Sequence, residues 1–199
     1  MTDHGYTVIG AASTRTARVL WMLEELGLPY QHIAARPRSA DVAQVNPAGK
    51  VPVLVADGVP ITDSTAIIQF LADRHGALTH PAGTLERARQ DSLTQFLLEE
   101  VDAALWMAAR HSFILPEELR HAAIKDSLKW EFQRSQSVLV ARMADGPFLM
   151  GAEMTVPDII AAHCGRWAAT ARFPITESRL AAYFDRLHAR PAYLRALAR

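Results

Sequence analysis

Cysteine is almost absent from this 199-residue sequence, in which Cys164 is the single example. One cysteine excludes an internal disulfide and a CxxC redox pair, and it is typical of a protein from a reducing compartment. A cytoplasmic location is the corresponding expectation. Any thiol chemistry carried out by this chain then requires a thiol that arrives with a bound molecule.

The spacing of metal ligands is also missing. The chain has eight histidines, but no two of them are three or four positions apart, the spacing that places two imidazoles on one face of a helix. Zinc sites are commonly built from such clustered histidines and cysteines. We therefore expect no metal site.

The sequence has no excess of either charge and no long apolar run. Lysine and arginine total 21, as do aspartate and glutamate, so neither a nucleic acid nor an anionic membrane is expected as a partner. No apolar stretch approaches the ~20 residues of a membrane helix, and Met1–Tyr6 lacks the charged start of a secretory signal. A hydrophobic content of 50% is enough for a packed core.

What the sequence does contain is a change of pattern near residue 80. The first part alternates β-prone runs with helical apolar spacing, whereas the part after Pro81 shows helical spacing alone. The segment 76–83 holds Pro81 and two glycines and reads as a linker. We therefore predict an α+β protein with a first domain over residues 1–78 and an all-helical domain over residues 84–199. The predicted strands are 6–10, 30–34, 53–56 and 60–61, and the predicted helices are 15–26, 39–45, 64–75, 85–111, 116–144, 156–171 and 178–190, with a short one after Pro191.

Several short motifs fix the ends of these elements. Gly27 follows the first helix where a left-handed residue commonly ends one, and the pair Asp57, Gly58 predicts a hairpin turn. The run from Thr155 to Asp158 has the spacing of a capping box, with aspartate in place of glutamate. We assign this box a role in folding and none in catalysis.

Two hydroxyl side chains lie between the first strand and the first helix. Unpaired amides and the helix dipole favour an anion there, so Ser13 or Thr14 is a candidate binding residue. The alternative is that one of them only caps the helix.

The loop NPAGKVPVL, residues 46–54, contains a second candidate. Pro52 cannot donate a ladder hydrogen bond, and if the preceding bond is cis, the amide and carbonyl of Val51 point outward and can pair with an extended peptide. Asp63 and Ser64 open the next helix, where a carboxylate attracts an ammonium group and helix amides attract a carboxylate. A plain N-cap is the alternative for that pair.

These motifs together resemble the cytosolic glutathione transferases, and the likeness covers the whole chain. The matching stretches are ASTRTARVLWMLEELGLPY, NPAGKVPVL and ITDSTAIIQFLADRHG in the first domain and MTVPDIIAAHCGRWA in the second. The resemblance implies a thioredoxin-like domain with a mixed four-stranded sheet, followed by an all-helical domain. Within the family, the chain is most similar to bacterial members of the serine type.

The resemblance assigns a role to each candidate in the first domain. Ser13, with Thr14 as the alternative, would donate a hydrogen bond to the sulfur of glutathione. Val51 would pair through its backbone with the cysteinyl unit, next to the cis-proline Pro52. The γ-glutamyl group would be held by Asp63 and Ser64, and the glycyl carboxylate by Lys50 with help from Arg38.

In the second domain, the family builds its electrophile pocket near the end of the first long helix. The matching residues here are Trp106, Arg110, His111 and Phe113. Packing in the core or against a second copy of the chain is an equally good interpretation of these side chains.

The implied function is that of a homodimeric glutathione transferase in detoxification, with glutathione as co-substrate, a small electrophile as partner and no metal. The loop AAST lacks the tyrosine and cysteine of other classes and the SSC run of the isomerase class, so maleylacetoacetate isomerase is disfavoured. Two alternatives stay open. One is a non-catalytic glutathione-binding or regulatory protein of the same fold, and the other is a glutathione-dependent reductase or peroxidase.

Overall fold

Strands and helices alternate along the first part of the chain, as the hydrophobic pattern predicts. The computed structural model describes residues 5–199, so the predicted start of the first domain at residue 1 lies outside the described part. Described residues up to Thr79 form one compact unit together with His188–Arg199. Its elements before Thr79 are β1 (Tyr6–Ile9), α1 (Thr16–Leu26), β2 (Tyr30–Ile33), α2 (Ala40–Val45), β3 (Val53–Ala56), β4 (Val59–Thr62) and α3 (Ser64–His75).

Within residues 5–199 the strands form one four-stranded sheet in the order β2-β1-β3-β4. Strand β1 runs parallel to β2 and antiparallel to β3, and β3 runs antiparallel to β4. The predicted mixed sheet of a thioredoxin-like domain is therefore confirmed. Pro60 lies on the edge strand β4, where a residue without an N–H is tolerated.

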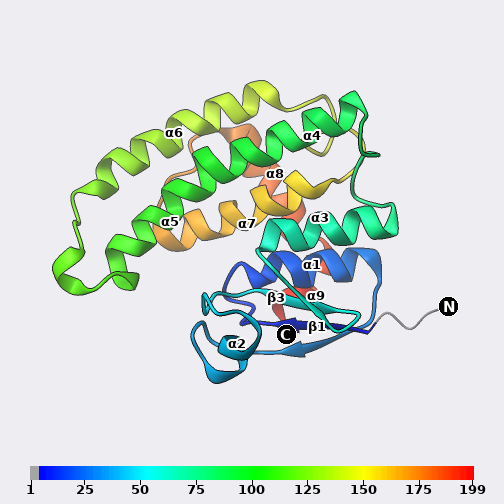
Figure 1. Cartoon of the computed structure of the whole chain (residues 1–199). Coiled ribbons are helices and arrows are strands. Elements are labelled where there is room, and N and C mark those ends of the chain that lie inside the picture. The colour runs from blue at the N-terminus through cyan, green and yellow to red at the C-terminus, as the bar shows by residue number, and fades with distance from the viewer. Residues whose placement is uncertain (1–4) are drawn as a thin grey trace. The chain divides into compact units, whose positions relative to one another are not determined.

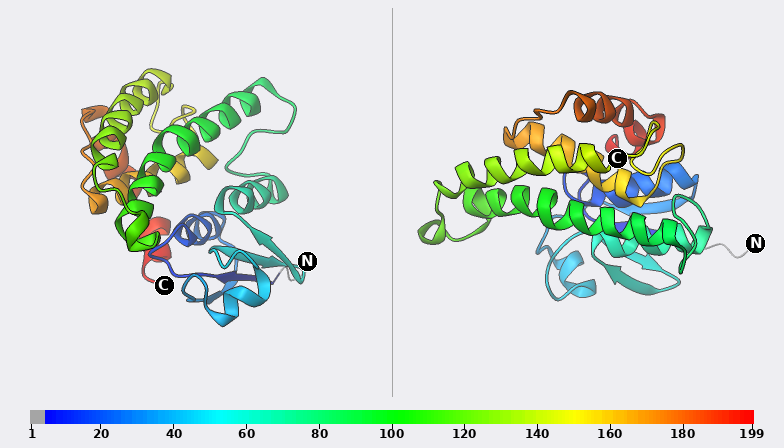
Figure 2. Two further views of the ribbon diagram at one scale, coloured as in Figure 1. Left: turned by 60° about the vertical axis from the view of Figure 1, so that its left-hand side comes forward. Right: turned by 90° about the horizontal axis from the view of Figure 1, so that it is seen from above.

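Helices cover both faces of this sheet. Figures 1 and 2 show α1 and α3 on one face and α2 on the other. Because side chains alternate along a strand, buried Val8 and Leu54 point to the α1 and α3 side. Ile9 and Val53 point the opposite way and form a buried cluster with Val42 of α2.

The last helix of the chain, α9 (Pro191–Leu197), packs against α1 in the same unit (Figure 1). The ring of Tyr193 meets Trp21 edge to face, with ring centroids 5.0 Å apart. The guanidinium of Arg190 donates to both carboxylate oxygens of Glu25 across 2.6 and 2.7 Å. A bidentate ion pair and an aromatic contact thus hold the C-terminal segment on the first unit.

The second compact unit consequently spans His80–Leu187. The helical domain expected from the sequence, residues 84–199, differs from this unit because the chain after Leu187 belongs to the first unit. Helical periodicity identifies a helix but does not say which core the helix packs on, so the sequence pattern alone does not reveal this return.

The second unit is helical, and its first four helical segments follow one another without a break. The backbone stays right-handed helical at the junctions from α4 to η2, so four assigned segments form one continuous rod that includes two π-helical stretches. This rod packs against α6 and α7. The elements are α4 (Leu85–Phe96), η1 (Leu97–Asp102), α5 (Ala103–Ala109), η2 (Arg110–Ile114), η3 (Glu117–Leu119), α6 (Ile124–Arg142), α7 (Val156–Ala171) and α8 (Ser178–His188).

The predicted helix start at Pro116 is wrong. Pro116 precedes only the short 3-10 turn η3, and the following helix α6 begins at Ile124. Two side-chain hydrogen bonds account for the interruption. Nε of Arg120 donates to the carbonyl of Leu115 across 2.7 Å, and the amide of His121 donates to Nδ1 of His111 across 3.1 Å. These bonds fix the chain in a non-helical path.

The predicted capping box at the start of α7 is confirmed. The amide of Thr155 donates to Asp158 across 2.8 Å, and the Thr155 side chain accepts from the Asp158 backbone. The carboxylate of Asp158 is fully buried and also accepts from the amide of Leu149 and the hydroxyl of Tyr183, across 2.8 and 2.7 Å. The box therefore ties α7 to a preceding loop and to α8.

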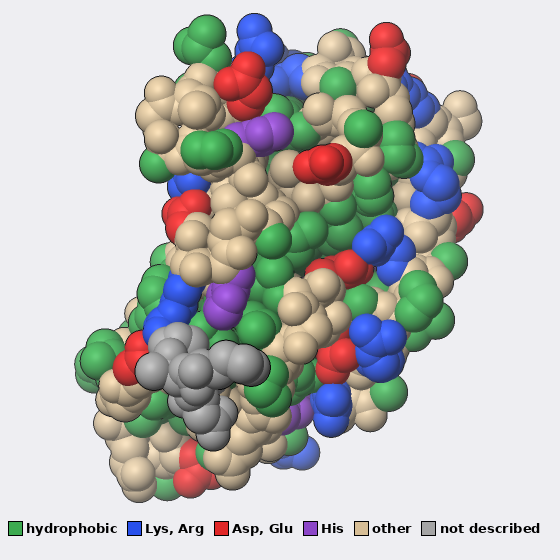
Figure 3. All heavy atoms as spheres, turned by 90° about the vertical axis from the view of Figure 1, so that its right-hand side faces the viewer, with side chains coloured by type: hydrophobic (Ala, Val, Ile, Leu, Met, Phe, Trp, Pro, Cys, Tyr) green, Lys and Arg blue, Asp and Glu red, His purple; other side chains and the backbone are tan. Residues whose placement is uncertain are grey.

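The surface carries both charges. On the face shown in Figure 3, basic and acidic side chains are interspersed, in keeping with equal numbers of the two in the sequence. Among residues 5–199, no helix combines the length and the apolarity that crossing a membrane requires.

Candidate functional site

Four segments of the first unit meet at one end of its sheet. Ile9, which ends β1, lies opposite Ile33, which ends β2, and opposite Val53, which begins β3. Val53 in turn lies opposite Thr62, which ends β4. Four connecting segments therefore meet at this end of the sheet. Three of them follow β1, β2 and β4, and the fourth leads into β3. They carry the predicted residues Ser13, Thr14, Arg38, Lys50, Val51, Pro52, Asp63 and Ser64.

Ser13 lies in a tight turn between β1 and α1. The amide of Thr14 donates to the carbonyl of Ala11 across 3.0 Å and closes the turn. The Ser13 side chain is exposed, and within residues 5–199 its hydroxyl has no hydrogen-bond partner. That hydroxyl is therefore available to a ligand.

The hydroxyl of Thr14 is already used inside the turn. It lies 2.7 Å from the carbonyl of Ala11, which can only accept, and it accepts from the amide of Thr16 across 3.2 Å. A hydroxyl has one proton to donate, so the contact of 2.9 Å between the two threonine hydroxyls is a donation from Thr16. The geometry favours Ser13 over Thr14 as the donor to a ligand, and this assignment stays a prediction.

Gly10 brings the Ser13 turn against the loop before β3. A Cβ at this position would lie 2.3 Å from Oγ1 of Thr16 and 2.9 Å from Cβ of Val51, and the backbone has a φ of +141°. Only glycine tolerates both the contact and the conformation. Gly10 is the last residue of the predicted strand 6–10. In the sequence, the close approach is indicated only by the position of this glycine between a β-prone run and the loop AAST.

The bond between Val51 and Pro52 is cis, as the family resemblance implies. Within residues 5–199, neither the amide nor the carbonyl of Val51 has a hydrogen-bond partner. The loop before it is held by the buried Asn46, whose side chain donates to the carbonyl of Lys50 across 2.9 Å and accepts from the amide of Ala48 across 3.1 Å. A firmly held loop thus presents an open backbone donor and acceptor.

Asp63 caps the next helix and keeps one carboxylate oxygen open. Its Oδ1 accepts from the amides of Thr65 and Ala66 across 2.8 and 3.1 Å, so it is the N-cap of α3. Its Oδ2 has no partner among the described residues. The residue is exposed and adopts a φ of +71°. One oxygen caps the helix, and binding of a cation by the other stays a prediction.

Ser64 is buried and linked to a residue that the sequence analysis missed. Nη1 of Arg18, which is 1% exposed, donates to Oγ of Ser64 across 3.3 Å. The hydroxyl proton of Ser64 is thereby left to donate elsewhere, and a buried positive charge lies next to the start of α3. In the sequence, Arg18 is distinguished only as a basic residue within the apolar run of α1.

Lys50 and Arg38 lie on adjoining stretches of chain. The amide of Arg38 donates to the carbonyl of Gly49 across 2.8 Å, so the two basic residues flank one backbone contact. Both are exposed. Two basic residues therefore adjoin the loop that carries Val51, and positive charge there would stabilise an anionic end of a peptide.

The predicted electrophile residues belong to the second unit and share one helical rod. Trp106 lies in α5, and Arg110 and Phe113 lie in the π-helical stretch η2 that follows it. Phe113 is 68% exposed, which excludes packing in the core for this ring. His111 is half-buried and accepts from the loop amide of His121.

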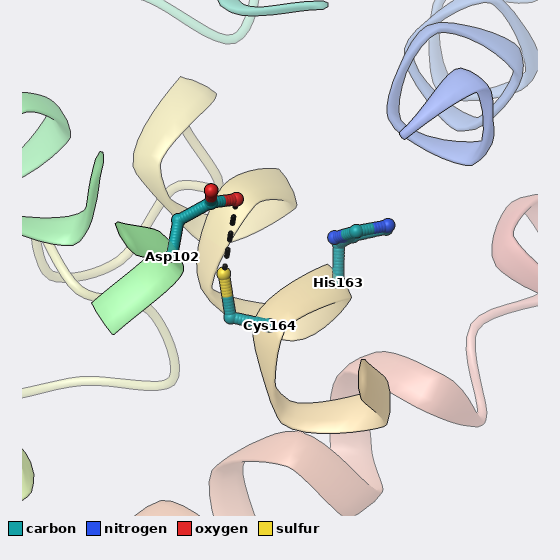
Figure 4. A group of neighbouring side chains, drawn as sticks. All are labelled: Asp102, His163 and Cys164. Atoms are coloured by element: carbon teal, nitrogen blue, oxygen red, sulfur yellow. Dashed lines mark hydrogen bonds between the residues drawn. The ribbon is translucent and has the colours of Figure 1, made fainter. Parts of the chain in front are cut away.

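One cluster of potential metal ligands occurs in the described chain, at Asp102, His163 and Cys164. The buried Cys164 thiol donates to Asp102 across 3.8 Å, and the imidazole of His163 extends away from that pair (Figure 4). The donor atoms of the three side chains all lie within 4.8 Å of one another. The arrangement contains a buried hydrogen bond between Cys164 and Asp102. The expectation that the protein holds no metal stays a prediction.

Comparison with known proteins identifies a matching family and several relatives of this chain. The family model for the N-terminal domain of glutathione S-transferase matches residues 12–74. Glutathione transferase GST 23 of Zea mays is 34% identical over 112 residues, which cover 53% of this chain and 50% of the maize protein. Glutathione S-transferase GstB of Escherichia coli strain K12 is 32% identical over 158 residues, 74% of each chain.

A solved structure agrees with these relatives over nearly the whole length. The crystal structure of a glutathione transferase from Methylococcus capsulatus strain Bath matches 97% of each chain with a TM-score of 0.82 and 28% sequence identity. The likeness spans both the mixed sheet and the helical unit. On the sequence and the fold together, this chain belongs to the glutathione S-transferase family.

Proposed function

We propose that this protein is a glutathione transferase in which the hydroxyl of Ser13 stabilises the thiolate of glutathione. The observation that carries the proposal is the meeting of three kinds of group at one end of the sheet. They are the unpartnered Ser13 hydroxyl, the open backbone of Val51 and the start of α3 at Asp63. A tripeptide with a thiol, a backbone and two charged ends is complementary to that set.

Each part of glutathione has a partner in this arrangement. The cysteinyl unit pairs with the backbone of Val51 as a short added strand. The γ-glutamyl ammonium binds the free oxygen of Asp63, and the γ-glutamyl carboxylate binds Ser64 and the amides that begin α3. The glycyl carboxylate is neutralised by Lys50, with Arg38 beside it.

The hydroxyl of Ser13 should lower the pKa of the glutathione thiol by an amount that can be calculated. A hydrogen bond to a charged group contributes roughly 1.5–3 kcal/mol, and one pKa unit corresponds to about 1.4 kcal/mol. Ser13 therefore lowers the pKa of the bound thiol by roughly one to two units from about 8.5, so that much of it is ionised near neutral pH. The thiol proton passes to solvent, and the sulfur then forms a bond to the electrophile as the leaving group departs with its electron pair.

The electrophile is assigned to Trp106, Arg110, His111 and Phe113. The exposed ring of Phe113 and the half-buried ring of Trp106 suit a flat apolar substrate, and the guanidinium of Arg110 suits an anionic leaving group. We further propose that the protein acts as a homodimer.

The first test is calorimetric titration of the wild-type protein with glutathione, followed by the pKa of the bound thiol from its thiolate absorbance. Ser13→Ala should raise that pKa by roughly one to two units and lower kcat with a halogenated aromatic substrate. Ser127→Ala is the matched control, because that exposed serine lies in the second unit and, within residues 5–199, its hydroxyl bonds only to the carbonyl of Ile124. An unchanged thiol pKa in Ser13→Ala would remove Ser13 from its role.

The nature of the reaction needs a substrate panel of halogenated aromatics, epoxides, peroxides and mixed disulfides. Turnover of the first two classes supports the transferase. Preference for peroxides or disulfides identifies a reductase or peroxidase instead. Glutathione binding with no turnover at all identifies a non-catalytic binding protein, and absence of binding overturns the proposal as a whole.

A further inference from the structure

We propose that His32 is a positioning residue for the Ser13 turn. Its imidazole holds the backbone carbonyl at the base of that turn and so sets where the Ser13 hydroxyl meets the sulfur. The inference rests on the proposed role of Ser13 and adds a residue on another strand to the same site.

The contact that carries the inference joins β2 to the residue after β1. Nε2 of His32 lies 2.8 Å from the carbonyl oxygen of Gly10. A carbonyl can only accept, so Nε2 carries the proton and donates. The amide of Gly10 donates to the carbonyl of Ile33 across 2.9 Å. Both polar backbone groups of Gly10 are therefore held by neighbouring residues of β2.

A side chain is needed at this point because the strand pairing has ended. His32 lies opposite Val8 in the parallel register, and the last paired residues are Ile9 and Ile33. Beyond them the backbone of β1 turns away with the φ of +141° at Gly10. The carbonyl of Gly10 then bonds to the half-buried imidazole of His32.

Gly10 is confined on its other sides as well. The closest approaches to an added Cβ are the side chains of Thr16 and Val51, at 2.3 and 2.9 Å. The imidazole of His32, the hydroxyl of Thr16 and the Val51 loop thus surround one residue. The turn begins at the next residue, Ala11, so movement of Gly10 would move the turn.

The turn itself transmits this position to Ser13. The carbonyl of Ala11 accepts from both the amide and the hydroxyl of Thr14, across 3.0 and 2.7 Å. A turn that is closed internally moves as a body when its base moves. Because a displacement of about 1 Å is enough to weaken catalysis strongly, holding the base of the turn matters for the Ser13 hydroxyl, which has no partner within residues 5–199.

The experiment compares three substitutions at His32 in the full-length protein. His32→Ala removes the donor, His32→Met keeps an apolar side chain of similar length without a donor, and His32→Gln restores an N–H at a similar reach. Gln31→Ala is the control, because Gln31 is exposed on the same strand. The measurements are the pKa of bound glutathione from thiolate absorbance, its Kd by calorimetry, and kcat with a halogenated aromatic substrate.

We expect His32→Ala and His32→Met to raise the thiol pKa by about half a unit to one unit and to lower kcat about three- to tenfold, the equivalent of one hydrogen bond. The Kd of glutathione should change less than twofold by the same reasoning, since the groups that bind its two ends are untouched. His32→Gln and Gln31→Ala should both resemble the wild type. An unchanged thiol pKa in His32→Ala, or a His32→Gln as impaired as His32→Ala, overturns the inference.

A second readout separates failure of this inference from failure of the proposed function. Hydrogen exchange at the amide of Thr14 reports closure of the turn in the absence of any ligand. If the wild-type protein does not bind glutathione, the proposed function fails, yet faster exchange in His32→Ala than in Gln31→Ala still supports His32 as the residue that holds the turn. Equal exchange in the two variants overturns that role.

Discussion

The hydroxyl of Thr14 donates to the carbonyl of Ala11 across 2.7 Å, three residues back along its own turn. The same carbonyl accepts from the amide of Thr14, so two hydrogen bonds to one acceptor close the turn. Two adjacent hydroxyl residues thereby acquire different roles. Thr14 shapes the turn, and Ser13 is left with a free proton at its tip.

Substitution of Thr14 should therefore act through the turn. Thr14→Ser keeps the hydroxyl and should leave the pKa of bound glutathione close to the wild-type value. Thr14→Val loses the hydroxyl that donates to Ala11 and accepts from the amide and hydroxyl of Thr16. Each lost hydrogen bond costs roughly 0.5–1.5 kcal/mol of folding free energy, and the thiol pKa should rise less than it does in Ser13→Ala. Thiolate absorbance against pH and urea unfolding measure the two effects. A Thr14→Val effect on the thiol larger than that of Ser13→Ala would make Thr14 the activating residue.

Gly10 should be the least replaceable residue of this region. Gly10→Ala introduces a Cβ 2.3 Å from Oγ1 of Thr16 at a φ of +141°. Overpacking and an unfavourable backbone region each cost roughly 1–3 kcal/mol. The variant should unfold at lower urea concentration and bind glutathione more weakly, because the Ser13 turn and the Val51 loop are forced apart. Gly5→Ala is the control, since no atom of residues 5–199 lies within 4 Å of its added Cβ. Equal stability of the two variants would contradict the close packing at Gly10.

Lys50 should recognise one end of glutathione and not the other. It is exposed, so an ion pair with the glycyl carboxylate is partly screened and contributes about 0.5–1 kcal/mol. Lys50→Ala should weaken glutathione about two- to fivefold in calorimetry. The dipeptide γ-glutamylcysteine lacks the glycyl group and should bind wild type and variant equally. An equal loss for both peptides would place Lys50 elsewhere on the ligand.

Several local features of both units follow from local sequence. The Asp57, Gly58 hairpin and the end of α1 at Gly27 are confirmed by left-handed backbone at those residues. The capping box of Thr155 is confirmed as well. These features were predictable because each depends on the conformational preference of one or two residues.

Features that depend on contacts between distant residues were not predictable in this way. Arg190 binds Glu25 across 165 positions of sequence, and the side chain of Arg18 reaches Ser64 across 46. The helical periodicity of α1 could not indicate either partner, because the helix is buried from Thr16 to Leu23 on nearly every side. The same limit applies to the candidate site, where strand register, not sequence spacing, brings the segments together.

The buried carboxylate of Asp158 should be central to the stability of the second unit. Asp158→Ala leaves the amides of Leu149 and Thr155 without their acceptor, and each unsatisfied buried donor costs roughly 1–3 kcal/mol. We expect a loss of about 3–5 kcal/mol, compared with about 1–2 kcal/mol for Tyr183→Phe, measured by urea unfolding. Because the two side chains share one hydrogen bond, the double variant should lose less than the sum of the single losses. Strict additivity would contradict the coupling.

Glu24 should make the stability of the first unit depend on pH. Burial alone would raise the pKa of its carboxyl, but hydrogen bonds from Arg195, Tyr30 and Arg199 outweigh burial and lower the pKa. Burial and the carboxylate together raise the pKa of Tyr30 to about 12, so its hydroxyl remains a donor across the acidic and neutral range.

The sign of the effect follows from proton binding. The folded pKa of Glu24 lies below the unfolded value of about 4.3, so the stabilisation is complete at neutral pH and is lost as the pH falls through the folded pKa. Glu24→Gln should therefore be less stable than wild type at pH 7, by about 1 kcal/mol because two of the donors are half exposed. The difference should shrink below about pH 4 in urea unfolding followed by circular dichroism. Glu153→Gln, at an exposed carboxylate of the second unit, is the control and should show no such dependence. A loss of stability in Glu24→Gln that stays constant from neutral to acidic pH would contradict the role of the ionised carboxylate.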